Sequence, residues 1–181
     1  MINMKWILLV LILSIPIIAI ALIAGHNQQI TGQAIAKTSL CLSVNGLPDA
    51  DCTPGAIDTN ITQDNIQSTI CVSGYTITVR PSTKYTNALK TQQIKDYGYT
   101  DTNLSNYEED HLISLELGGS PTDPKNLWPE PYNIPNGARV KDRLENLLHK
   151  MVCNGTIPLA EAQYEIATNW YLYYNNYGLG S

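Results

Sequence analysis

Apolar residues recur at helical spacing in the C-terminal third of the chain. A helix is expected from about Ala138, with an apolar stripe formed by Val140, Leu144, Leu147, Leu148 and Met151. Its opposite face, expected to be solvated, carries Asp142, Glu145 and His149, although Glu145 and His149 also have the four-residue spacing of a ligand pair. A second helix is expected over residues 159–174, with one face formed by Leu159, Ala162, Ile166, Trp170 and Tyr173. Both helices are therefore expected to pack on a common core.

Short extended runs precede these helices. The apolar run at residues 112–117 predicts a strand that ends in a Gly-Gly turn. A second short segment, residues 126–128, is expected to return beside it before Pro129 and Pro131 end it. The predicted local order is strand, strand, helix. Farther upstream, a β-type run lies at residues 75–79 and a helix is expected over residues 87–97.

Composition divides the chain into four segments. Residues 1–24 contain an apolar run from Trp6 to Ala24, which approaches the length of a membrane-spanning helix and predicts a signal peptide or, preferably, an uncleaved anchor. Residues 25–40 are expected to be a linker, residues 41–105 an N-terminal extension packed on the core, and residues 106–181 the core with its C-terminal helices. The length beyond the linker suits one compact α+β domain.

The apolar run and the cysteines both point to export. Lys5 before the run favours a cytoplasmic N-terminus and an extracytoplasmic remainder, either secreted or bound to the membrane through residues 6–24. The four cysteines all follow the run: Cys41, Cys52, Cys71 and Cys153. Two disulfides are expected, with three possible connectivities, of which Cys41–Cys52 with Cys71–Cys153 is our prediction; free buried thiols are the alternative.

Net charge limits the function classes. The chain has 11 Lys plus Arg against 16 Asp plus Glu, a formal net charge of −5. This balance disfavours long-range attraction to polyanions and argues against a sequence-specific DNA-binding regulator. A nuclease tolerates it, because a nuclease needs only a local cationic site and a metal ion.

Asp110 and His111 are the strongest candidates for chemistry. A histidine titrates close enough to neutrality to take a proton from water, and a carboxylate is a preferred ligand of hard divalent cations. Adjacent strand residues point to opposite faces, so a bend or a strand end is needed to bring both side chains to one cleft. The alternative is a hydrogen-bonded surface pair. Glu108 and Glu109 are expected to be solvated charges or to protect the strand edge, and not to be metal ligands.

The order of groups around this pair resembles a known family. The segments EEDHLISLELGG, NLWPEP and KDRLENLLH are similar to the His-Me finger nucleases of the HNH type, in particular to small exported bacterial or archaeal proteins, and the likeness extends from about Cys52 to Tyr174. The resemblance implies a ββα-metal core with His111 as general base, Asp110 as metal ligand and Asn126 as the residue that orients the histidine. A plain turn-forming role is the alternative for Asn126.

The resemblance also implies a third metal ligand from the helix. No His or Asn fills that position plainly, and Asn136 is our choice, with Asn133 and Glu145 as further candidates. The implied cofactor is a divalent metal ion, with Mg²⁺ preferred over Mn²⁺. The implied substrate is nucleic acid, with DNA cleaved without sequence specificity preferred.

Basic residues near the start of the helix are candidates for substrate binding. Arg139, Lys141 and Arg143 could hold phosphates, as could Arg80 and Lys84 upstream. A salt-bridged helix surface is the alternative for the first three. Two other functions remain open for the chain: a noncatalytic envelope module of the same fold, and a disulfide-stabilised extracytoplasmic binding domain.

Overall fold

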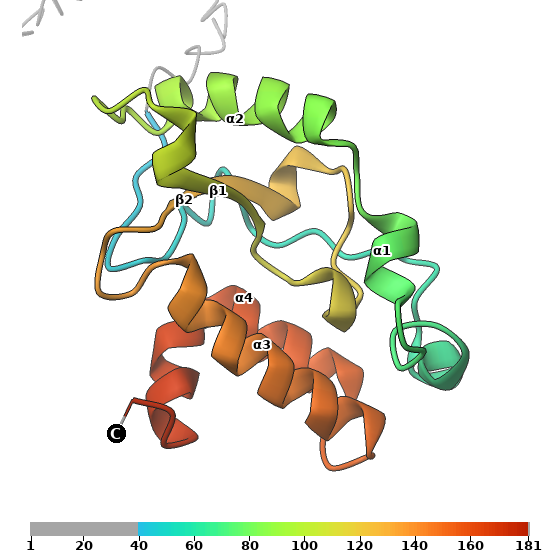
Figure 1. Ribbon diagram of the computed structural model, residues 1–181. Coiled ribbons are helices and arrows are strands. Elements are labelled where there is room, and N and C mark those ends of the chain that lie inside the picture. The colour runs from blue at the N-terminus through green and yellow to red at the C-terminus, as the bar shows by residue number, and fades with distance from the viewer. Residues whose placement is uncertain (1–39, 181) are drawn as a thin grey trace, which may run out of the picture. The chain divides into compact units, whose positions relative to one another are not determined.

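A computed structural model describes residues 40–180 (Figure 1). It shows an α+β domain with a two-stranded antiparallel sheet and two disulfides. The helices and strands are, in chain order, α1 (Tyr75–Val79), α2 (Thr83–Asp96), β1 (Tyr107–His111), β2 (Leu127–Pro131), α3 (Ala138–Cys153) and α4 (Leu159–Asn176). Short 3₁₀ helices lie between them.

The sheet lies between helices on its two sides (Figure 1). Helix α2 covers one face, where Lys90 Nζ donates to the carbonyl of Tyr107 at 2.9 Å and Gln93 Nε2 donates to the carbonyl of Leu127 at 2.6 Å. On the other side, α3 packs against α4 and against the loop that follows β1. The strand–strand–helix order that the sequence predicts is present as β1, β2 and α3.

The boundaries of β1 differ from the prediction. The strand ends at His111, and residues 112–117 form a turn and a short 3₁₀ helix, Leu115–Leu117. Leu112 and Ile113 are both buried in the core. Because neighbouring side chains of a strand point to opposite faces, a turn lets both enter the same core. The apolar run therefore marks the core-lining loop after the strand, and the strand itself is the polar segment before it.

The prolines of β2 do not end it. The strand continues to Pro131, with Glu109 opposite Pro129 and Tyr107 opposite Pro131. The N–H of Tyr132 donates to the carbonyl of Asn106 at 3.0 Å, so alternate positions turn their nitrogens away from β1. Proline is tolerated on such an outer edge because no ladder hydrogen bond is lost there.

Two upstream predictions have different outcomes. The run at residues 75–79 is the short helix α1 and not a strand, which shows tertiary context overriding a β-branched composition. The expected helix over residues 87–97 is confirmed as α2, but it begins a turn earlier, where Ser82 Oγ accepts the N–H of Tyr85 at 3.3 Å.

The C-terminal helix confirms its predicted face. Leu159, Ala162, Ile166 and Trp170 are buried in the main core with Leu144 and Leu148 of α3. Tyr174 completes the buried face in place of the expected Tyr173, which is half-buried.

Both disulfides have the predicted connectivity. Cys41 bonds Cys52, and Cys71 bonds Cys153 at the last residue of α3. The second bridge ties the extension to the core. Two disulfides indicate an oxidising, extracytoplasmic environment.

Within residues 40–180, no helix is long and apolar enough to cross a membrane. The predicted signal or anchor at residues 6–24 and most of the predicted linker lie outside the described residues.

Candidate active site

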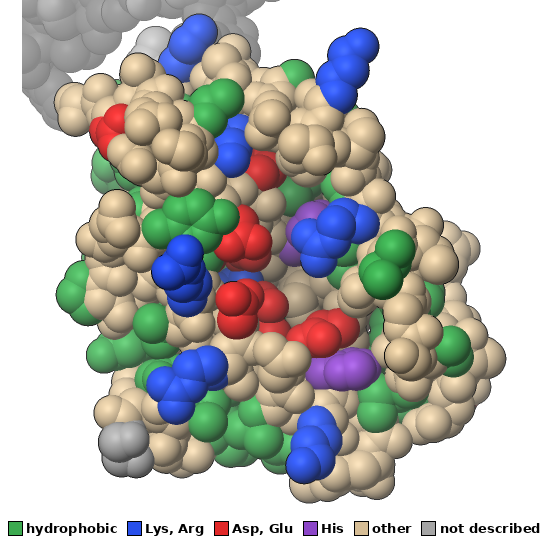
Figure 2. All heavy atoms as spheres, viewed as in Figure 1, with side chains coloured by type: hydrophobic (Ala, Val, Ile, Leu, Met, Phe, Trp, Pro, Cys, Tyr) green, Lys and Arg blue, Asp and Glu red, His purple; other side chains and the backbone are tan. Residues whose placement is uncertain are grey.

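Asp110 and His111 lie at the end of β1 and line one cavity. Both side chains are buried, and the cavity, of about 60 Å³, is lined by Arg80, Glu108, Glu109, Asp110, His111, Ser114, Leu115, Asp142 and Glu145. The chain turns immediately after His111, which is the strand end that the adjacent pair requires to share a cleft. Figure 2 shows acidic side chains gathered around a hollow in this face of the molecule.

His111 is held as a neutral proton acceptor. Its Nε2–H donates to the carbonyl of Pro121 at 3.0 Å, which leaves Nδ1 with the free lone pair in the neutral ring. Burial lowers the pKa of His111 below its ordinary value, and the nearby Arg80 and Lys141 charges lower it further, against the opposing effects of the Pro121 bond and Asp110. The imidazole is therefore neutral at physiological pH.

Asn126 fixes the loop that carries Pro121. Its Oδ1 accepts the N–H of Ile113 at 2.9 Å, and its Nδ2 donates to the carbonyls of Ile113 and Ser120, each at 3.0 Å. A Cβ on Gly119 would lie 1.7 Å from the carbonyl of Ile113, so only glycine fits at this crossing. The fully buried Asn126 thus braces the loop whose Pro121 carbonyl contacts His111, and is more than a turn former.

Lys141 is a buried member of the site. The side chain is 1% exposed, and its ammonium donates to Asp110 Oδ2 at 2.5 Å, to the carbonyl of His111 at 3.0 Å and to Glu145 Oε1. The structure therefore contradicts the expectation of a phosphate contact for Lys141 on the surface. The signal that the sequence did carry is the helical spacing of Lys141, Leu144, Glu145 and Leu148, which places all four on one buried face.

Glu145 is the helix residue that reaches the cavity. It was expected on the solvated face of α3, but it is buried and contacts Lys141. Asn136, our first choice for the helix ligand, instead donates its amide to the carbonyl of Asn45 at 3.2 Å and does not line this cavity, and Asn133 is exposed outside it. Asp142, on the same helix, lies at the rim.

The site holds more carboxyl groups than cations. Burial raises the pKa of Glu109 to about 8 and that of Glu145 to about 8, with Asp110 adding to both shifts. Glu130, fully buried beside Asp110, has a pKa raised well above its ordinary value, first by burial and then by Asp110. No N–H group within residues 40–180 donates to the Glu130 carboxylate. A hard divalent cation would relieve this concentration of carboxylates, so the donor set fits such an ion.

The available positive charge comes from the upstream side, where Arg80 is one of the two further candidates for a phosphate contact. Arg80 is exposed, has no ion pair within the described part of the chain, and lines both the acidic cavity and a neighbouring cavity of about 220 Å³. Arg139 lies over the Tyr132 ring at 5.5 Å, and Arg143 donates to the Tyr174 hydroxyl at 2.6 Å. Neither Arg139 nor Arg143 lines either cavity.

The neighbouring cavity extends the site towards α2. It shares Arg80, Glu108, Glu109 and His111 with the acidic cavity. Its remaining lining is Pro81, Thr83, Thr86, Asn87, Lys90 and Tyr132. The two cavities therefore adjoin at β1, one on the side of α2 and the other on the side of α3.

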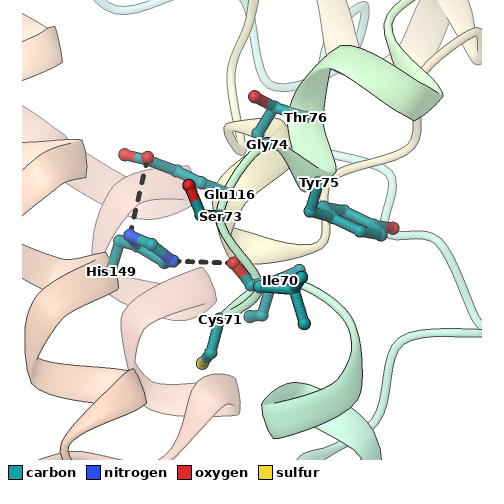
Figure 3. Close-up of a pocket in the computed structure, with 9 residues that line it drawn as sticks. Ile70, Cys71, Ser73, Gly74, Tyr75, Thr76, Glu116 and His149 are labelled. Atoms are coloured by element: carbon teal, nitrogen blue, oxygen red, sulfur yellow. Dashed lines mark hydrogen bonds and ion pairs between the residues drawn. The ribbon is translucent and has the colours of Figure 1, made fainter.

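His149, the second histidine within residues 40–180, is held by contacts with the surrounding fold. Its Nε2–H donates to the carbonyl of Ile70 at 2.9 Å, and its Nδ1 lies 3.6 Å from Glu116 (Figure 3). The sulfur atoms of Cys71 and Cys153 lie close enough to His149 for a metal site, but they are bonded to each other and offer no thiolate. His149 is half-buried and bonded, in contrast to the solvated position expected for it.

The chain matches no protein-family model, and comparisons with curated proteins and with solved structures find no significant similarity.

Proposed function

We propose that this protein is an extracytoplasmic, metal-dependent phosphodiesterase that hydrolyses nucleic acid with a ββα-metal core of the His-Me finger type. One observation carries the proposal: Asp110 and His111 at the end of β1 line a single cavity with Glu145 of α3. Asn126 supports it, because it braces the loop that holds His111.

His111 acts as the general base. Its Nδ1 takes a proton from a water molecule, the water oxygen attacks phosphorus, and the bond between phosphorus and the leaving oxygen breaks. The Pro121 carbonyl keeps the Nε2 proton in place, so the ring presents Nδ1 in the correct tautomer. Asn126 and Lys141 keep the loop and the strand end in register during this step.

Asp110 and Glu145 are the residues that would hold the metal ion. A divalent cation would supply positive charge to the phosphate and the leaving oxygen, and carboxylate donors suit both Mg²⁺, our preferred ion, and Mn²⁺. The cavity walls would otherwise repel a phosphodiester, since five carboxyl residues face one arginine there. Metal dependence is therefore part of the proposal.

Arg80 is the proposed phosphate contact. Its free guanidinium at the junction of the two cavities can bind a phosphate oxygen without reading sequence. The proposed substrate is accordingly nucleic acid without sequence specificity, with DNA preferred.

The test uses the full chain in mild detergent, with both disulfides formed. Plasmid DNA and RNA are incubated with Mg²⁺, Mn²⁺ or EDTA, and His111→Ala is compared with the matched variant His149→Ala. We expect cleavage that requires metal, falls about 10²-fold or more in His111→Ala and persists in His149→Ala. Equal loss in two folded histidine variants, or none in either, would remove His111 from its proposed role.

A noncatalytic module of the same fold is the second candidate. It is favoured by the Lys141 ammonium, which already neutralises part of the charge of Asp110 and Glu145. A folded wild type that cleaves neither nucleic acid in either metal would select this candidate.

A further inference from the structure

The contacts of Lys141 are those expected of a metal ion. An ammonium has three N–H donors and no acceptor. Lys141 uses them on a carboxylate of β1, a carboxylate of α3 and a backbone carbonyl, namely Asp110 Oδ2, Glu145 Oε1 and the oxygen of His111. Carboxylate and carbonyl oxygens are the ligands that hard divalent cations take in proteins.

This oxygen cluster lies below the cavity and not in it. Lys141 is 1% exposed and does not line the cavity, whereas its partners Asp110 and Glu145 do. Glu130 is fully buried, interacts electrostatically with Lys141, and has no N–H donor of its own. The cluster therefore contains a further carboxyl group, which lies beside Asp110 and receives no N–H group.

We propose that Lys141 is a built-in counter-cation that fills the deep oxygen cluster, so that a divalent ion binds only in the outer cavity, one ion per chain. The lysine holds Asp110 and Glu145 by one oxygen each and leaves both residues at the cavity wall. It is a positioning residue, since it does not touch the substrate. The outer-cavity part of this inference rests on the proposed function; the occupation of the deep cluster does not.

Removal of the ammonium should convert the deep cluster into a metal site. In Lys141→Met, two buried carboxylates lose their counter-ion, which destabilises the fold, and a divalent ion can replace the lost charge. If Lys141 contributed only the packing of its side chain, an added divalent ion would not restore the stability of Lys141→Met.

The experiment compares full-length wild type, Lys141→Met and Lys150→Met, each with both disulfides formed. Lys150 is an exposed lysine of the same helix and serves as the matched control. Mn²⁺ binding is followed by calorimetry at pH 8, and thermal unfolding is recorded in EDTA and in Mn²⁺. We expect Lys141→Met to bind Mn²⁺ about tenfold tighter or more than wild type, because a repelling charge has been removed from the cluster. Its unfolding temperature should be lowered in EDTA and restored by Mn²⁺, while Lys150→Met behaves as wild type.

A second variant guards against packing effects. Lys141→Gln removes the charge but retains a polar side chain with two N–H donors, so it should show the same gain in Mn²⁺ affinity and the same rescue. The inference is overturned if neither variant gains affinity or thermal rescue, or if wild type binds two ions per chain. A wild type that binds no ion and cleaves nothing would remove the proposed function, yet a gain in the variants would still establish the role of Lys141.

Discussion

Burial changes the chemistry of single residues in the acidic site. His111 has a lowered pKa and a fixed tautomer, both of which suit a base that works near neutral pH. Lys141 is buried among carboxyl groups, and its ammonium donates a hydrogen bond to Glu145 Oε1. On an open surface, lysine and glutamate would be solvated ions and histidine would titrate at its ordinary pKa.

Asn126 should be critical to both stability and activity. Asn126→Ala leaves the N–H and carbonyl of Ile113 without their partners in a buried loop. We expect a loss of about 2–4 kcal/mol in the free energy of unfolding, measured by urea denaturation, together with loss of cleavage. The exposed Asn133→Ala should change neither, and an unfolding free energy of Asn126→Ala equal to that of wild type would contradict the bracing role.

Some individual residues of the candidate site could be predicted from the sequence. Asp110, His111 and Asn126 could be named because their order resembles a known motif, and all three lie in or beside the site. Lys141 and Glu145 were assigned to the surface, because burial of a charged pair depends on which strand faces the helix. Helical spacing places Lys141 on the same face as Leu144, Glu145 and Leu148. That this face meets Asp110 of β1 is a tertiary property, which spacing along one helix does not encode.

Among the secondary-structure elements, β1 determines the position of the site, because Asp110 and His111 lie at its end. The polar strand Tyr107–His111 supplies Asp110 and His111, and the apolar loop after it enters the core. Periodicity could predict α3 and α4, which bury long stripes, whereas α2 buries only Lys90, Gln93 and Ile94. Periodicity misplaced β1, because a two-stranded sheet between helices has no simple alternation of polar and apolar positions.

The contact between α2 and the sheet gives a pH-dependent stability. Tyr97, which follows α2, is buried near Trp128, its hydroxyl is hydrogen-bonded to Thr53 Oγ1 at 2.7 Å, and burial raises its pKa to about 12. The folded state therefore holds the phenolic proton more tightly than the unfolded state. This contribution to stability is complete below pH 10 and is lost as the pH rises towards 12.

Tyr97→Phe tests this contribution. The variant should lose less stability than wild type between pH 9 and pH 11, as measured by urea unfolding at each pH, because the titrating group has been removed. Tyr164→Phe, at an exposed position, is the control. Parallel pH profiles for wild type and Tyr97→Phe would show that the burial of this hydroxyl has no effect on alkaline stability.

At the scale of the whole molecule, the two disulfides close loops of very different length. The sequence separation is 82 for Cys71–Cys153 and 11 for Cys41–Cys52. The chain-entropy model gives about 4–5 kcal/mol for the longer loop and about 3 kcal/mol for the shorter. The cysteine pattern predicts two disulfides in an exported chain, and the pairing chosen among the three possible connectivities is the one that the fold contains.

Removal of each disulfide in turn should show that the two bridges stabilise the fold by different amounts. The double variant Cys71→Ala with Cys153→Ala should lose more unfolding free energy than Cys41→Ala with Cys52→Ala, as measured by urea denaturation of the oxidised proteins. The reverse order would mean that the longer loop is already held closed by packing in the unfolded ensemble.

We propose that β1 and α3 together form one metal-dependent hydrolytic site. The most direct test of this proposal is the initial rate of DNA cleavage as Mg²⁺ is raised, measured for wild type, His111→Ala and Glu145→Gln. We predict that Glu145→Gln needs more Mg²⁺ to reach half its maximal rate, whereas His111→Ala keeps the wild-type Mg²⁺ requirement and has a maximal rate lower by about 10²-fold or more. A Glu145→Gln curve that superimposes on the wild-type curve, with His111→Ala equally active, would contradict the account.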